Sequence, residues 1–386
     1  MIAEPKTPAV QFGSSRGTHS EFDAWHMRRA LELAIRGQGH VEPNPLVGSV
    51  VVQTDGTVVG EGFHKRFGDA HAEIEALRVA GSRAVGATLY VTLEPCCHHG
   101  KTPPCTEAIV AAGIRRVVAA LPDPFPAVSG GGLRALEAAG VEVRVGLLSD
   151  DARRINAPYL KLVERGVPWI IAKWAMTLDG KLATRLGDSR WISGEAARRV
   201  THQIRGRVDA ILIGSGTAAA DDPLLTARPA GFRTATRVVV DSRAVLSLES
   251  QLVRTAKETP VLVAVGPDAD EASRKKLTDA GCEIWLCEAT DSQERLRLLL
   301  QELGRRRMTN VLVEAGGRLL GSFFDAGQID EVHAFIAPKL IGGLSATSPF
   351  AGAGVERMDQ ALALEEPQVR TLGADVYVSG RVRRGG

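Results

Sequence analysis

Two short stretches of this chain carry metal-binding side chains, and they restrict what its N-terminal part can form. The first, His71-Ala72-Glu73, offers one imidazole and, two residues later, one carboxylate. The second places Cys96 and Cys105 around a loop rich in glycine and proline. One nitrogen and two sulfur ligands suit a tetrahedral zinc ion and leave its fourth position open, as in catalytic zinc sites. The fold must therefore bring two separate segments of the chain to one point.

The order H-x-E, then P-C, then a second cysteine is the signature of zinc deaminases, which remove amino groups from cytosine-like or adenine-like rings. We therefore predict that His71, Cys96 and Cys105 bind zinc and that Glu73 is the general acid/base. The common second half is P-C-x-x-C, whereas the spacing here is C-x8-C. The sequence thus predicts a longer metal-binding loop than usual.

Other residues of this loop leave alternatives open. Cys97 competes with Cys96 as a ligand, and we prefer Cys96 because it directly follows Pro95, as the signature requires. A structural zinc site closed by His98 or His99 would have four protein ligands. A redox cluster of thiols is a further alternative to a catalytic site.

Composition excludes several classes of protein. The net charge of +2, with 24% charged and 44% hydrophobic residues, is that of an ordinary globular protein. Balanced charge and only 5% aromatic residues argue against nucleic-acid binding. Five cysteines, three of them in one loop, favour a reducing cytoplasm over a disulfide framework. No apolar run is long enough to predict a membrane span.

Hydrophobic periodicity predicts an α/β protein of two domains. Residues 1–20 lack an apolar segment and are expected to be a disordered tail rather than a signal peptide. Strands and helices alternate through a predicted zinc domain over residues 21–149, which suggests a mostly parallel sheet with helices on both faces. Asp23 is expected to cap its first helix. A polar helical connector follows over residues 150–166, and a second domain is expected over residues 167–386.

The second domain is expected to contain eight strands, with glycine-rich turns between strands and helices. Gly316-Gly317 suits either a phosphate at a helix N-terminus or a structural tight turn. Residues 240–243 suit either the 2′-phosphate of NADPH or a solvated turn. Cys282 and Cys287 are expected to be buried core thiols. The predicted strands are 167–173, 210–214, 237–241, 261–265, 283–286, 311–314, 331–337 and 374–380.

Motifs in both halves resemble the bifunctional riboflavin-biosynthesis deaminase–reductase family. The resemblance implies a cytidine-deaminase-like N-terminal domain and a dihydrofolate-reductase-like C-terminal domain. It also implies zinc-dependent deamination of 2,5-diamino-6-ribosylamino-4(3H)-pyrimidinone 5′-phosphate, followed by reduction of the ribosyl group to ribityl with NADPH. The matching motifs are residues 43–48, 71–73, 92–96, 100–105, 177–180, 220–223 and 313–317.

The resemblance assigns further residues to each site, although each taken singly has an ordinary structural explanation. It implies that Asn44 and Lys101 contact the deaminase substrate. In the reductase, it implies that the cofactor is lined by Ala175, Trp191, Thr217, Asp221, Ser242, Gly316, Gly317, Arg318, Leu319, Leu320, Gly321 and Ser322. It implies that the sugar phosphate is held by Lys173, Ser189, Arg205, Leu225, Arg228 and Glu314.

One departure from the family concerns the deaminase pocket. The family usually has Asp-Pro-Asn-Pro where this chain has Asp123-Pro124-Phe125-Pro126. An aromatic ring cannot replace the hydrogen bonds of an asparagine, so Phe125 is expected to affect substrate binding rather than zinc chemistry. The rival functions are a nucleoside or nucleobase deaminase fused to an unrelated nucleotide-binding module, and an RNA-modifying protein. The resemblance also suggests a homo-oligomer, as a dimer or tetramer.

Overall fold

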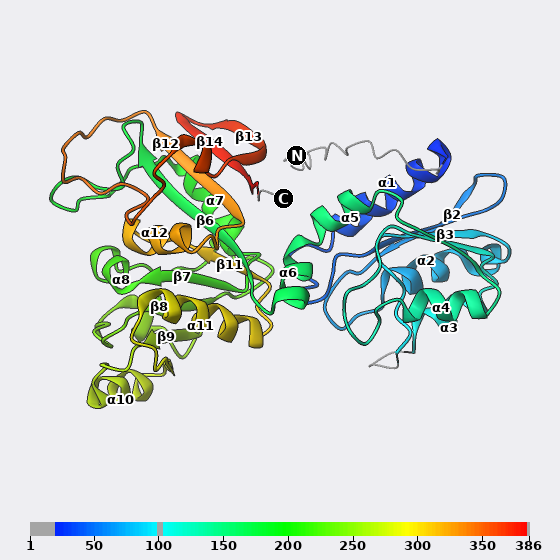
Figure 1. Cartoon of the computed structure of the whole chain (residues 1–386), viewed down its shortest axis with the longest axis horizontal. Coiled ribbons are helices and arrows are strands. Elements are labelled where there is room, and N and C mark those ends of the chain that lie inside the picture. Colours follow the sequence, from blue (N-terminus) through cyan, green and yellow to red (C-terminus); the bar gives the residue numbers. More distant parts are fainter. Residues whose placement is uncertain (1–19, 99–102, 384–386) are drawn as a thin grey trace. The chain divides into compact units, whose positions relative to one another are not determined.

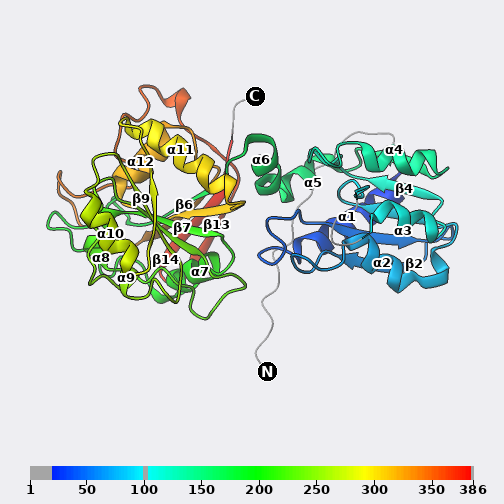
Figure 2. The same cartoon turned by 90° about the horizontal axis from the view of Figure 1, so that it is seen from below.

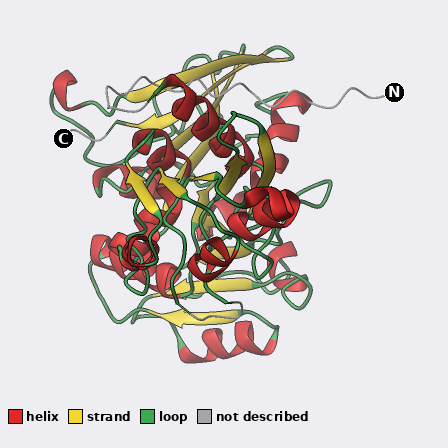
Figure 3. Ribbon diagram, turned by 90° about the vertical axis from the view of Figure 1, so that its right-hand side faces the viewer, coloured by secondary structure: helices red, strands yellow, loops and turns green. Residues whose placement is uncertain are grey.

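The chain forms two compact units, the first ending at Glu164 and the second beginning at Arg165. The computed structural model, shown in Figure 1, describes residues 20–98 and 103–383. Both units combine strands with covering helices (Figure 3). Within the described ranges, no helix has the length and apolar character needed to cross a membrane. The expected tail over residues 1–20 lies almost entirely outside the described residues.

The sheet of the first unit is mixed, with the strand order β2-β1-β3-β4-β5. The hairpin of β1 and β2 turns at Asp55-Gly56, and β1 also runs antiparallel to β3. Strand β1 is antiparallel to both of its neighbours, so β2, β3, β4 and β5 run in one direction, and the expected mostly parallel sheet is interrupted at β1 alone. The strands are β1 (Gly48–Val52), β2 (Val58–Phe63), β3 (Thr88–Val91), β4 (Arg116–Ala119) and β5 (Glu142–Val145).

Helices cover both faces of this sheet and bury two apolar layers. On one face, Met27 and Leu31 of α1 pack with Val50 of β1. On the other, which carries α2 and α3 (labelled in Figure 2), Leu77 and Ile109 pack with Val51 of β1 and Leu89 of β3. The helices are α1 (Glu21–Ile35), α2 (Ala72–Ala80), α3 (Cys105–Ala111), α4 (Gly131–Ala138), α5 (Ser149–Ile155) and α6 (Ala157–Arg165), with a short 3₁₀ turn at Gly81–Ala84.

The N-terminal cap of α1 is Ser20 rather than the expected Asp23. The Ser20 hydroxyl accepts a hydrogen bond from the Asp23 backbone N–H at 3.1 Å. The buried Asp23 carboxylate instead accepts from the Tyr90 hydroxyl at 2.6 Å and from Arg116 at 3.0 Å. The prediction failed because the partners of the Asp23 carboxylate, Tyr90 on β3 and Arg116 on β4, are far from Asp23 in the sequence.

The helices α5 and α6 belong to the core of the first unit. Ala152, Tyr159 and Leu160 are buried with the α1 layer of the sheet. The segment 150–166 was expected to be a polar connector, but its side chains complete this hydrophobic layer up to the boundary at Glu164. The first unit therefore needs these helices to bury its sheet.

The second unit contains a nine-stranded sheet in the order β10-β9-β8-β7-β11-β6-β12-β14-β13. The seven strands from β10 to β12 in this order are parallel to one another. Strand β14 is antiparallel to both β12 and β13. The strands are β6 (Trp169–Thr177), β7 (Ala210–Gly214), β8 (Thr236–Val240), β9 (Val261–Val265), β10 (Glu283–Leu286), β11 (Asn310–Val313), β12 (Glu331–Ala337), β13 (Leu364–Leu372) and β14 (Asp375–Val382).

Two helix layers cover this second sheet. Ile204 of α7 and Leu277 of α10 join one apolar layer. Leu300 of α11 and Phe323 of α12 join the opposite layer. Cys282 and Cys287 are buried, which confirms their expected place in the core. The helices are α7 (Glu195–Arg205), α8 (Ser215–Asp221), α9 (Gln251–Arg254), α10 (Glu271–Asp279), α11 (Ser292–Arg305) and α12 (Gly317–Asp325), with a 3₁₀ turn at Met358–Gln360.

The sequence prediction missed β13. Nearly all of its residues are exposed, and it includes Glu365, Glu366 and Pro367. Strand prediction relies on alternating or continuous apolar residues, and proline counts against a strand interior. This strand forms at the edge of the sheet, where it pairs with β14 around an irregular register near Pro367.

Candidate active sites

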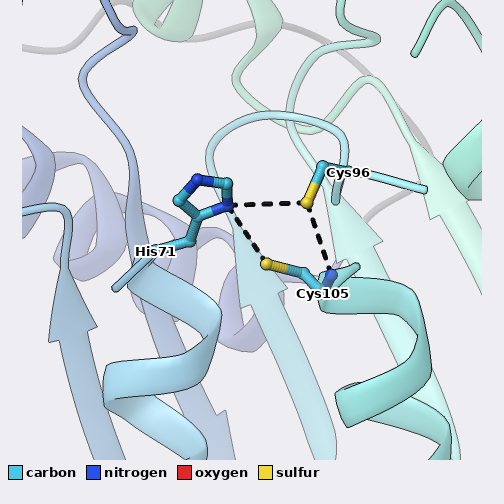
Figure 4. Close-up of side chains that lie close together, drawn as sticks. All are labelled: His71, Cys96 and Cys105. Carbon is cyan, nitrogen blue, oxygen red and sulfur yellow. Dashed lines mark hydrogen bonds between the residues drawn. The ribbon is translucent and has the colours of Figure 1, made fainter. Parts of the chain in front are cut away.

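His71, Cys96 and Cys105 converge at one point of the first unit (Figure 4). The His71 Nδ1 atom lies 3.3 Å from Cys105 Sγ and 3.5 Å from Cys96 Sγ. All three ligand atoms lie within 4.8 Å of one another. One imidazole nitrogen and two thiol sulfurs at this separation fit a tetrahedral zinc ion with one open position.

The elements around this cluster explain its geometry. His71 is the N-terminal cap of α2, and Cys105 is the first residue of α3. Cys96 follows β3 and is held by the Cys105 backbone N–H, which donates to its sulfur at 3.3 Å. A side chain at Gly62 would clash with the Ala72 carbonyl at 2.4 Å, so this glycine lets α2 lie against β2. Helix N-termini also favour thiolates and other anions.

Hydrogen bonding between the two thiols shifts their pKa values in opposite directions, and the hydrogen bond to Cys96, together with burial, raises the pKa of Cys105. Hydrogen bonding from Cys105 and His71 lowers the pKa of Cys96 to about 4, although burial opposes it. Burial raises the pKa of the Glu73 carboxyl, which lies two residues from His71 on α2. A buried carboxyl whose pKa is raised holds a proton more readily than an exposed one, as a group that both accepts and donates a proton must.

Of the alternative ligands, Cys97 and His98 do not join the cluster. Cys97 lies beside the N-terminus of α4, where an added side chain at Gly131 would meet its sulfur at 2.8 Å. His98 is exposed, and its ring lies 6.4 Å from that of Phe125. Within residues 20–98 and 103–383, the metal-binding group consists of three residues. His99 lies outside those ranges.

His64 is a residue of this site that the sequence prediction missed. It is buried, and its Nε2 lies 3.2 Å from Asn44 Nδ2, while Nδ1 lies 3.1 Å from the Ala70 carbonyl. Its ring meets the His71 ring edge-on at a centroid distance of 5.5 Å. The sequence Phe63-His64 at the end of β2 carries no recognisable metal spacing, so only the three-dimensional fold identifies it. Asn44 is thereby brought beside the cluster, whereas Lys101 lies outside the described residues.

In the second unit, Lys173, Arg205 and Glu314 form a buried ion cluster. The Glu314 carboxylate accepts from Arg205 Nε at 2.6 Å, from Arg205 Nη2 at 3.0 Å and from Lys173 Nζ at 3.2 Å. Lys173 lies on β6, and Glu314 directly follows its neighbour β11. The carboxyl ends of parallel strands meet at one edge of a sheet, which is where α/β enzymes bind ligands. Three residues far apart in the sequence are thus brought together.

The charge of Glu314 makes the stability of the second unit depend on pH. Burial alone would raise its pKa, but Arg205 and Lys173 outweigh this effect and lower the pKa from 4.5 to about 2. A carboxyl with a depressed folded pKa stabilises the fold above its unfolded pKa and loses that contribution as pH falls toward the folded pKa. We expect the free energy of unfolding to fall by up to about 3 kcal/mol between pH 5 and pH 2, measured by guanidinium titration.

The matched comparison for this pH dependence is Glu314→Gln. Because glutamine does not titrate, this variant should show a weaker loss of stability across the same pH range. The buried Glu331, whose pKa is also lowered to about 2, would retain its own contribution. An equal pH dependence in both proteins would contradict the assignment to Glu314.

The glycines after β11 have a packing role. The Gly316 backbone N–H donates to the Thr217 hydroxyl at 3.2 Å, which joins two of the residues expected at the cofactor. A side chain at Gly317 would clash with the Ser348 carbonyl at 2.4 Å, and one at Gly321 would overlap the Ala351 carbonyl. Close packing of residues 348–351 against α12 therefore accounts for both of these glycines.

The other strand ends place further expected residues. Asp221, at the end of α8, accepts from the Ser189 hydroxyl at 3.1 Å. Ser242 follows β8, and the neighbouring Asp241 is buried and accepts from the Leu246 backbone N–H at 2.7 Å. The Asp241 carboxylate is therefore committed to its own turn, while Ser242 and Arg243 are exposed, which is compatible with either role expected of residues 240–243.

The remaining expected residues differ in exposure. Trp191 is exposed, with the Arg198 guanidinium 4.6 Å from its ring centroid. Leu225 is buried, and the exposed Arg228 lies 3.4 Å from the Thr226 hydroxyl. Ala175 lies on β6, and Arg318, Leu319, Leu320 and Ser322 lie on α12.

Comparison with curated proteins gives relatives that match nearly the whole chain. The riboflavin biosynthesis protein RibD of Actinobacillus pleuropneumoniae is 40% identical over 356 residues, which cover 92% of this chain and 94% of that protein. RibD of Bacillus amyloliquefaciens is 41% identical over 360 residues, which cover 92% and 95% respectively.

Solved structures agree with these relatives. Acinetobacter baumannii RibD, form 1, is 38% identical with a TM-score of 0.82, covering 94% of this chain and 99% of that chain. A diaminohydroxyphosphoribosylaminopyrimidine deaminase/5-amino-6-(5-phosphoribosylamino)uracil reductase from Thermotoga maritima is 34% identical with a TM-score of 0.81, at the same coverage.

Family models divide the chain as its fold does. The cytidine and deoxycytidylate deaminase zinc-binding region matches residues 20–121, and the RibD C-terminal domain matches residues 168–378. The fold and sites thus define a bifunctional enzyme, a zinc-dependent deaminase joined to an NADPH-dependent reductase with a dihydrofolate-reductase-like fold. The chain belongs to the RibD family of riboflavin biosynthesis proteins. The expected family, fold class, bifunctional activity and cofactors are confirmed.

Proposed function

We propose that the first unit deaminates 2,5-diamino-6-ribosylamino-4(3H)-pyrimidinone 5′-phosphate and that the second reduces the ribosyl group of the product. The observation that supports the first step is the cluster of His71, Cys96 and Cys105 beside the buried Glu73. The three ligands would hold a zinc ion that, when bound, lowers the pKa of a water molecule and makes it a nucleophile at neutral pH. Asn44, oriented by His64, would contact the substrate together with Lys101.

Glu73 would move the protons of the deamination. Its carboxylate would accept a proton from the attacking water and deliver it to the ring nitrogen. It would then accept the second proton of that oxygen and deliver it to the amino group, which leaves as ammonia. Its burial supports this role, because burial raises the pKa of the carboxyl and so favours the neutral, proton-donating form more than water does. Phe125 is 42% exposed on the loop after β4, where its ring would border the substrate rather than bind it by hydrogen bonds.

In the second unit, NADPH supplies the hydride for reduction of the sugar C1′. Lys173, Arg205 and Glu314 would hold the sugar phosphate end of the substrate together with Ser189, Leu225 and Arg228. The cofactor would lie along the strand ends near Thr217, Ser242 and the start of α12. Asp221, which accepts from Ser189, would orient the substrate or manage a proton near C1′.

We also propose where this enzyme acts and how it assembles. The enzyme would act in the cytoplasm on a small pyrimidine ribosyl phosphate, without a nucleic-acid or membrane partner. It would assemble as a homo-oligomer, as a dimer or tetramer.

A coupled assay with the pyrimidine substrate and NADPH tests both steps. We expect ammonia release followed by loss of NADPH absorbance. Removal of zinc with a chelator should abolish ammonia release and leave NADPH oxidation intact when the deaminated product is supplied, because the metal-binding cluster lies entirely in the first unit. Restoring zinc should restore ammonia release.

Ammonia release from cytidine or guanine, with no turnover of the pyrimidine ribosyl phosphate, would contradict the proposed substrate. NADPH oxidation that requires deaminated product even with zinc present would instead place the defect in the deaminase pocket, where Phe125 departs from the family.

A further inference from the structure

Residues 156–159, at the junction of α5 and α6, hold the loop that carries Asn44. Asn156 is buried, and its side chain pairs with both backbone groups of Leu46: Leu46 N–H donates to Oδ1 at 2.8 Å, and Nδ2 donates to the Leu46 carbonyl at 3.0 Å. A primary amide can satisfy one N–H and one C=O of a loop in this way, as a neighbouring strand would. Leu46 is two residues from Asn44, whose side chain contacts His64 next to the metal-binding His71. This pair therefore holds the loop on the Asn44 side of the metal site.

The same segment holds a second loop of the site, the one that follows β4. The buried Tyr159 of α6 donates its hydroxyl to Asp123 Oδ1 at 2.8 Å. The same oxygen accepts from the Phe125 backbone N–H at 2.9 Å, which closes the turn that presents the Phe125 ring. The conformation of this turn therefore depends on a hydroxyl from outside the sheet.

This second loop is connected to Cys96 through Glu94. The Asp123 backbone N–H donates to Glu94 Oε2 at 3.1 Å. The Glu94 carboxylate also accepts from backbone N–H groups at the start of α4, at 3.0 Å from Gly130 and 2.9 Å from Gly132. Glu94 is two residues before Cys96, so one continuous set of buried hydrogen bonds runs from Tyr159 to the metal-binding loop.

We propose that Asn156 and Tyr159 are positioning residues of the deaminase, which hold the Asn44 loop and the Asp123–Phe125 loop in the conformation that receives the substrate. The expected effect on deamination rests on the proposed function, whereas the expected effect on loop conformation rests on the hydrogen bonds alone. Asn156 bonds Leu46 and Tyr159 bonds Asp123, so both residues would act on the site through these two partners.

The test compares two buried tyrosine hydroxyls of the first unit in the full chain. Tyr159→Phe removes the bond to Asp123, whereas Tyr90→Phe removes an equally buried bond, from Tyr90 to Asp23 at 2.6 Å, that contacts neither loop. We expect Tyr159→Phe alone to speed hydrogen–deuterium exchange of the backbone over residues 121–130. We also expect its kcat/KM for deamination to fall about fivefold to tenfold, mainly through KM.

A stronger variant, Asn156→Leu, leaves both backbone groups of Leu46 without their partner, and we expect faster exchange over residues 44–48. In both loop variants, zinc content and reduction of supplied deaminated product should match the unaltered chain. Equal exchange and equal KM in Tyr159→Phe and Tyr90→Phe would overturn the proposal and leave Tyr159 with a stabilising role only. If the unaltered chain fails to deaminate the pyrimidine, the proposed substrate is wrong, and the exchange measurement still decides the positioning role.

Discussion

Replacing Glu73 by glutamine should lower the rate of deamination by about 10³-fold or more while zinc remains bound. Glutamine has nearly the size of glutamate but cannot accept a proton, and positioned acid–base groups contribute about 10²–10⁴-fold to such reactions. Glu73 is not one of the three clustered ligands, so the metal content should stay at that of the unaltered chain. Ammonia release and zinc content, measured on the same preparation, check this result.

The matched control for this variant is Glu75→Gln, on the same helix. Glu75 pairs with Lys65 and Arg78, whose side chains are 50% and 70% exposed, and it is not one of the three clustered metal-binding residues. We expect this variant to deaminate at the rate of the unaltered chain. Reduction of supplied deaminated product should be unchanged in both. Substantial deamination by Glu73→Gln would remove Glu73 from the mechanism.

Replacing Glu314 by glutamine should have the largest effect on the second unit. The side chains of Glu314, Arg205 and Lys173 are only 7%, 13% and 16% exposed. Removing one partner of a buried ion pair leaves uncompensated charge and costs about 3–5 kcal/mol. We expect a loss of stability of this order, and a fall of about 100-fold or more in NADPH oxidation with supplied product. Ammonia release by the first unit should persist.

Glu302→Gln is the control for Glu314→Gln. Glu302 also pairs with two arginines, Arg305 and Arg306, but these are 73% and 21% exposed. Ion pairs near the surface contribute roughly 0–1 kcal/mol each, so this variant should lose at most about 2 kcal/mol of stability and keep NADPH oxidation. A reductase rate unchanged by Glu314→Gln would show that the ion cluster does not serve the site.

The sequence predicted the features that depend on particular residue types at a fixed spacing along the chain. The H-x-E and P-C pattern predicted the three residues that cluster, and the βα alternation predicted eight of the nine strands of the second sheet. The choice of Cys96 over Cys97 followed from Pro95 alone and agrees with the cluster in the structure. Such features depend on residues close together in the chain, which sequence reading resolves well.

Features that depend on distant partners were not predictable. Nothing near Asp23 indicates that its carboxylate bonds Tyr90 and Arg116, and nothing near Asn156 indicates its pairing with Leu46. His64 was missed for the same reason, because its partner Asn44 lies on another segment. Pairings of this kind follow from the tertiary fold, which local spacing does not encode.

The exposed strand β13 also bears on how this protein behaves at high concentration. An edge strand presents unpaired backbone groups on which another chain can add a strand, a first step toward aggregation. Here Glu365 and Glu366 add charge, and Pro367 lacks an N–H group just where the register with β14 is irregular. These three residues disfavour uncontrolled strand addition, so the edge of a large sheet can face solvent without promoting fibril-like growth.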